Sequence, residues 1–112
     1  MRAQPAQKAQ PLLQAALRAD SFLSGAYYYL GKALSQLGQD QAAVENIKES
    51  IAVNPQGDFL TSAYYQLFLV YRKLNRKKEA KAAFENFERL KAAEEQKAAH
   101  TLSEKLKRNS PN

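Results

Sequence analysis

Residues 27–55 read YYYLGKALSQLGQDQAAVENIKESIAVNP, and this stretch decides the fold. Its apolar residues recur three or four positions apart, as on one face of a helix, and no part alternates as a strand does. Gly38 divides the stretch, because glycine readily takes the left-handed conformation that ends a helix. Asp40 is suited to cap a second helix, which Asn54 and Pro55 then end. The stretch therefore predicts two helices joined by a short turn.

The same pattern returns further along the chain, where residues 64–84 read YYQLFLVYRKLNRKKEAKAAF. A shift of 37 residues pairs Tyr27 with Tyr64, Tyr28 with Tyr65, Leu30 with Leu67, Leu37 with Leu74, Ala43 with Ala80 and Ile47 with Phe84. A shift of 34 residues pairs Leu13 with Ile47. Two offsets in register with one helix–turn–helix unit indicate an internal repeat.

Punctuating residues place the other helices. Pro11 suits the first position of a short helix, the region from Asp58 to Leu74 has helical spacing, and no Gly or Pro interrupts residues 77–107. The chain therefore predicts an all-α fold of five helices with a long last one. We divide it into a flexible N-terminal segment 1–10, the second helix of a partial repeat 11–21, two repeats 22–56 and 57–92, a C-terminal capping or extension helix 93–108 and a tail 109–112.

The repeated unit resembles the tetratricopeptide repeat over roughly residues 9–92. The first copy carries Tyr27-x-x-Leu30-Gly31-x-x-Leu34 and ends at Pro55. The second departs from the family pattern at Phe68, which replaces a small residue, and at Ala92, which replaces the closing proline. The resemblance implies antiparallel helix–turn–helix repeats stacked as a short right-handed α-solenoid. The incomplete first unit suggests that the chain is part of a larger protein.

Composition excludes several classes of function. The 112 residues contain no Cys and one His, so disulfides, thiolate chemistry and Cys-ligated zinc are excluded and the redox compartment is not indicated. The sequence shows no glycine-rich phosphate loop and no nucleophile elbow. No apolar stretch approaches the roughly 20 residues of a membrane span. We expect neither enzymatic activity nor a cofactor or metal.

The resemblance implies a concave groove, lined by the first helices of successive repeats, that binds a peptide or a partner helix. The groove positions are Tyr28, Lys32, Ser35, Gln36, Ser62, Tyr65, Gln66, Leu69, Arg72 and Lys73. Tyr rings are good contact surfaces, and the two cations suit a carboxylate. Alternatively, Tyr28 and Tyr65 merely cover the surface left by the missing N-terminal helix of the partial repeat. The Lys and Asn clamp by which some family members hold a C-terminal carboxylate is not present.

The net charge of +6 comes from the C-terminal part. Residues 1–71 hold five basic and five acidic side chains, whereas residues 72–112 hold twelve and six. The densest cluster comprises Arg72, Lys73, Arg76, Lys77, Lys78 and Lys81. It predicts either binding of nucleic acid or another anionic surface, which we place below protein binding, or a solvated turn whose cations suit the end of a helix.

The C-terminal helix is the remaining feature. Beyond about Gln96 the apolar stripe is thin, mostly Ala with Leu102 and Leu106. This part is either a solvated projecting helix or a seam for another chain. We favour a role in capping the array, with self-association into a homo-oligomer second. His100 stands alone among polar residues, which argues against a metal site.

Overall fold

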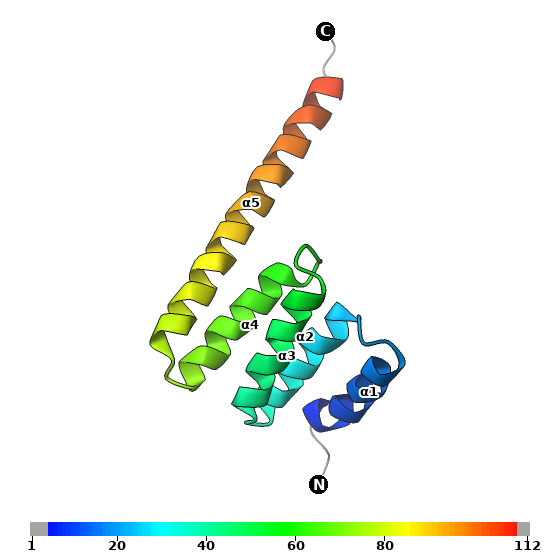
Figure 1. Cartoon of the computed structure of the whole chain (residues 1–112). Helices are drawn as coiled ribbons and strands as arrows, with labels where there is room; N and C mark the ends of the chain where they lie inside the picture. The colour runs from blue at the N-terminus through cyan, green and yellow to red at the C-terminus, as the bar shows by residue number, and fades with distance from the viewer. Residues whose placement is uncertain (1–4, 110–112) are drawn as a thin grey trace.

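The computed structural model describes residues 5–109, and these residues form five helices and no strand. The helices are α1 (Pro5–Ala19), α2 (Ser24–Gln36), α3 (Asp40–Val53), α4 (Leu60–Lys73) and α5 (Lys77–Asn109). Figure 1 shows α1 beside the α2–α3 hairpin, followed by the α4–α5 hairpin, with α5 extending far beyond its neighbours. The prediction of an all-α chain of stacked antiparallel hairpins with a long last helix is confirmed.

The turns inside the two hairpins close in the same way. Gly38 has φ of 80° and Asn75 has φ of 58°, the left-handed conformation that ends a helix. The amide of the residue after Gly38 donates to the carbonyl of Leu34 at 2.8 Å, and the amide after Asn75 donates to the carbonyl of Tyr71 at 2.9 Å. Each turn thus satisfies carbonyl groups that the end of the helix leaves free. The repeat seen in the sequence is therefore a repeat of backbone hydrogen bonds.

Small side chains bring α2 and α3 close together. A Cβ atom placed on Gly31 would lie 2.5 Å from Ile47 Cγ1 and 3.1 Å from the carbonyl oxygen of Ala43. Ala43 and Ile47 are fully buried, as are Ala63 and Val70 of α4. All four belong to one apolar cluster that includes residues of α2, α3, α4 and α5. The two hairpins therefore share a core, as stacked repeats do.

The first helix begins earlier than predicted. α1 starts at Pro5 and contains Pro11 in its interior. Ala6 is buried, and Leu13 and Leu17 pack against the common core. The prediction that residues 1–10 are flexible is therefore wrong for residues 5–10, because packing on α2 outweighs the local cost of an internal proline. Residues 1–4 lie outside the described part of the chain.

The last helix is one continuous element. Phe84, Phe87 and Leu90 are half-buried, whereas every residue from 91 to 103 is exposed. The segment 93–108 therefore extends α5 and does not cover the end of the array, because its thin apolar stripe has little to bury. Of the predicted tail 109–112, Asn109 closes α5 and the other residues lie outside the described range.

Candidate functional site

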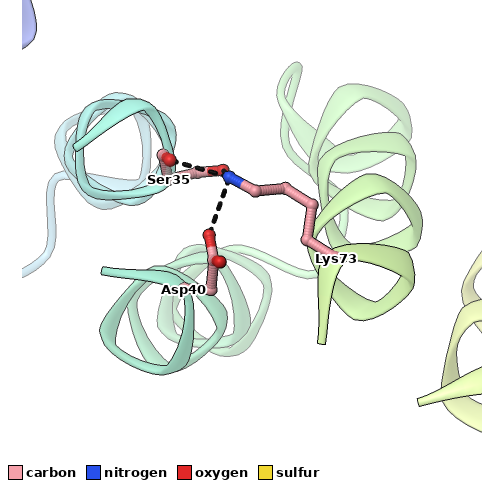
Figure 2. A network of polar contacts seen from close by, with 3 residues as sticks. All are labelled: Ser35, Asp40 and Lys73. Carbon is pink, nitrogen blue, oxygen red and sulfur yellow. Dashed lines mark hydrogen bonds and ion pairs between the residues drawn. The ribbon is translucent and has the colours of Figure 1, made fainter. Parts of the chain in front are cut away.

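Lys73, in the last turn of α4, joins three helices (Figure 2). Its Nζ lies 2.8 Å from Asp40 Oδ1 at the start of α3. The same ammonium donates to the carbonyl oxygen of Ser35 at 2.8 Å and to Ser35 Oγ at 3.1 Å, at the end of α2. A cation near the end of α2 and a carboxylate at the start of α3 both suit the helix dipoles. This contact links the end of α4 to both helices of the first hairpin.

Asp40 does not cap α3, contrary to the sequence prediction. Gln39 stands at the cap position, and no side chain hydrogen-bonds to the first amides of the helix. Asp40 is the first helical residue, and its carboxylate turns toward Lys73. The attraction of the ammonium therefore replaces the local capping bond.

An open hollow of about 470 Å³ lies between α2 and α4. Its lining residues are Ser35, Gln66, Leu69, Arg72 and Lys73. We call these five residues the α2–α4 groove. All five are among the ten groove positions that the sequence indicates, and they come from the first helices of the two hairpins.

Tyr28 is not part of this groove. Its side chain is only 8% exposed, and the centre of its ring lies 5.4 Å from that of Phe59. Burial raises the pKa of its hydroxyl, with a smaller opposing effect from the side chain of Ser62. The expectation that Tyr28 faces the groove is wrong, because Phe59 covers it. Of the three consecutive residues Tyr27, Tyr28 and Tyr29, it is Tyr29 whose side chain is exposed, at 49%.

The other four expected groove residues are dispersed. Lys32 and Gln36 line a separate hollow of about 150 Å³ against α1. Tyr65 is 39% exposed but rests on the core, with its ring centre 5.0 Å from that of Phe87. Ser62 is exposed and lies beside the Tyr28 hydroxyl. These side chains do not meet at the α2–α4 groove.

Two cations of the basic cluster are engaged with the first hairpin. Lys73 makes the contacts described above, and Arg76 Nη2 donates to Gln41 Oε1 at 2.7 Å. Arg76 Nη1 also lies 3.6 Å from Glu79 Oε2. For Lys73 and Arg76, these contacts favour a structural role at the turn over the binding of an anionic partner.

The rest of the cluster lies on a different surface. Arg72, Lys77 and Lys81 line a hollow of about 510 Å³ between α4 and α5, together with Phe68, Asn75, Ala80 and Phe84. The guanidinium carbon of Arg72 lies 5.3 Å from the centre of the Phe68 ring. Lys78 is exposed. The sequence indicated Phe68 and Phe84 only as positions of the repeat and did not place them beside these cations, although the 37-residue shift pairs Phe84 with the core residue Ile47.

Two further features of the described residues concern metal ligands and helix hydropathy. Within residues 5–109, no group of three or more His, Asp or Glu side chains is placed to hold a metal ion. No helix in this range has the length and hydropathy that crossing a bilayer requires.

Comparison with known proteins supports the repeat assignment. The sequence model of the tetratricopeptide repeat matches residues 24–56 and 61–95, the two hairpins of the structure. No curated protein matches the sequence.

Solved structures of MamA are similar in fold. The crystal structure of MamA is 28% identical, with a TM-score of 0.65 over 84% of this chain and 52% of that chain. A MamA mutant is 23% identical, with a TM-score of 0.70 over 78% of this chain and 46% of that chain. This chain thus spans about half the length of these structures. With the family model matched by both hairpins, this chain belongs to the tetratricopeptide repeat family.

Proposed function

We propose that this chain is a non-enzymatic interaction module that binds an extended peptide segment of another protein in the α2–α4 groove. Tetratricopeptide repeats generally mediate contacts between proteins. The observation that carries the proposal is the open hollow whose lining comes from two rigid first helices. Sites on helices held by packing are better preorganised than sites on loops.

The chemistry of the groove suits a peptide. Leu69 is half-buried and offers an apolar surface, whereas Gln66 can both donate to and accept from a peptide backbone. Arg72 is exposed and suits a carboxylate. Lys73 contributes mainly by fixing the groove wall, because its ammonium is already bound to Ser35 and Asp40. A peptide with an apolar residue near an acidic one is the expected ligand.

The internal contacts of Lys73 and Arg76 favour this function over binding of nucleic acid through residues 72–81. Binding of nucleic acid depends on the number of free cations that contact phosphates. Two of the six cations already have carboxylate or carbonyl partners in the first hairpin or in the first turn of α5.

The test uses short peptides selected against the chain from a random library. The double variant Gln66→Ala with Leu69→Ala should weaken binding by about tenfold or more, since a few central residues carry most of the binding energy of an interface. Leu102→Ala is the control, because this exposed leucine lies on the extension of α5. Circular dichroism and thermal melting should be unchanged in both variants. Equal affinity of every selected peptide for the parent and the groove variant would refute the groove.

A further inference from the structure

The hollow between α4 and α5 is open in the second hairpin. In the first hairpin, the equivalent surface is covered by α4. We call its lining residues Phe68, Arg72, Asn75, Lys77, Ala80, Lys81 and Phe84 the α4–α5 face. Ala80 is buried at its floor, the two Phe rings are half-buried, and the three cations are exposed. The ring centres of Phe68 and Phe84 are 4.7 Å apart. The face is therefore an apolar floor with a basic rim.

The internal repeat shows what packs on the equivalent face of the first hairpin. A shift of 37 residues maps the α4–α5 face onto Gly31, Ser35, Gly38, Asp40, Ala43, Val44 and Ile47 of the first hairpin. In that hairpin, α4 packs on the equivalent surface: Ala43, Val44 and Ile47 are buried in the same cluster as Ala63 and Val70 of α4. The α4–α5 face thus occupies the position where a further helix would stack.

The charge of the two surfaces is opposite. In the first hairpin, Ser35 and Asp40 accept the ammonium of Lys73 from the docked helix (Figure 2). The equivalent positions of the second hairpin are Arg72 and Lys77, and Lys81 replaces Val44. A helix with a cation at the position of Lys73 would be repelled there, whereas a carboxylate would find charge-assisted donors.

The helices at either end of the described chain have the wrong charge for this face. The 37-residue period maps α4 onto the segment from residue 97, but residues 97–109 continue α5 instead. That segment contains Lys97, Lys105, Lys107 and Arg108 against Glu104, so it is basic. The α1 helix contains no acidic residue. Neither helix complements the basic rim, whether it comes from this chain or from a second copy.

We propose that the α4–α5 face docks an amphipathic helix of a different protein, with carboxylates level with the α4–α5 turn. The apolar side of the helix covers Phe68 and Phe84, and its carboxylates bind Lys77, Lys81 and Arg72. This surface is separate from the α2–α4 groove except for Arg72, which lines both hollows. The proposal does not depend on the groove binding a peptide.

The test compares two helical peptide probes that share a Leu and Ala stripe and differ only by Glu or Lys at two positions beside it. Fluorescence anisotropy should show the Glu probe binding about tenfold tighter or more than the Lys probe, since opposite charges attract and like charges across an interface repel. The double variant Lys77→Asp with Lys81→Glu should reverse this preference. Acidic residues suit the first turns of a helix, so the variant should fold.

The matched control is Lys97→Asp with Lys105→Glu, which makes the same change in net charge on the exposed part of α5. This control should keep the parent preference, as should the groove variant Gln66→Ala with Leu69→Ala. Equal binding of the two probes, or a preference that the Lys77 and Lys81 changes leave intact, overturns the proposal. So does tighter binding of a single-stranded oligonucleotide than of the Glu probe. Self-association of the chain that the Lys77 and Lys81 changes abolish would assign the face to a second copy, and also overturns it.

Discussion

Gly31 lies where α2 and α3 are closest, and its missing side chain is a packing requirement. Alanine normally stabilises the interior of a helix by about 1 kcal/mol relative to glycine. Here the new Cβ would lie 2.5 Å from Cγ1 of Ile47, whose side chain is fully buried. We expect Gly31→Ala to lower the free energy of unfolding by about 2 kcal/mol, as overpacking does, in urea denaturation.

A second substitution checks the cause of that loss. Ile47→Ala should cost less in the Gly31→Ala background than in the parent chain, because the added methyl group fills part of the cavity. Increased stability of the Gly31→Ala variant would contradict the close contact.

Two tyrosines make stability depend on pH at the alkaline end. Burial raises the pKa of Tyr28 and of Tyr71 above the ordinary value of 10.0, and for Tyr71 the charge of Glu79 adds to the effect. The unfolded chain therefore releases these protons at lower pH than the folded chain does. The free energy of unfolding therefore keeps its full value below pH 10 as far as these two groups are concerned. It should fall as the pH rises above 10, where the unfolded chain loses these protons first. Urea denaturation from pH 8 to pH 11 measures the slope, which should be smaller for Tyr71→Phe; an equal slope would rule out a contribution from Tyr71.

At the scale of elements, the sequence predicted a helix end correctly where a single residue in the turn determines it. Gly38 takes the left-handed conformation that the sequence indicated, and Asn75 takes it in the equivalent turn of the second hairpin, because the turn requires it regardless of packing. Pro11 gave the opposite result: it is a strong local signal, yet α1 runs through it because the apolar contact with α2 is non-local. The burial of Tyr28 was missed for a similar reason, since it depends on Phe59, which lies in the segment between α3 and α4.

The candidate groove was partly predictable for the same reasons. The resemblance implied Gln66, Leu69 and Arg72 as groove positions on α4, and the structure brings them together. Lys32 and Gln36 share the spacing of α2, but α1 lies beside them. A pattern on one helix specifies its faces, and only the neighbouring helix decides which face stays open.

The extension of α5 should contribute little to the stability of the body. Residues 91–103 are exposed, and the hydrogen bond that Thr61 Oγ1 donates to Glu94 Oε1, at 2.5 Å, lies outside residues 97–112. Deleting residues 97–112 should change the free energy of unfolding by less than about 1 kcal/mol, while the helical signal in circular dichroism falls. A large loss of stability would mean that the extension packs on the body.

The same deletion tests self-association through the C-terminal helix. Leu102 and Leu106 are 59% and 63% exposed, four residues apart on one face of α5. Sedimentation equilibrium of the parent and the deletion variant decides the question. A dimer that becomes a monomer on deletion supports an assembly role, and a monomeric parent chain excludes it.

For the whole molecule, the stacked arrangement predicts a gradient of local stability. The structure is elongated, with extents of 63 × 34 × 30 Å, and each helix contacts mainly its neighbours. The helices α2, α3 and α4 each bury four or five residues, whereas Ala6 is the one buried residue of α1. Amide hydrogen exchange should be slowest in α2, α3 and α4 and fastest in α1 and residues 97–109. Protection of α1 equal to that of α3 would contradict this order.

Because α5 continues without a break past Ala92, each later residue has a defined direction around the helix axis. Its segment from residue 93 to 109 is about 25 Å long at a rise of 1.5 Å per residue, and successive residues are rotated by about 100° around the helix axis. Inserting one residue between Ala99 and Leu102 would therefore turn everything beyond it by about 100°, whereas inserting four would turn it by only about 40°. The number of residues in this arm sets both how far from the body its far end lies and in which direction its side chains point.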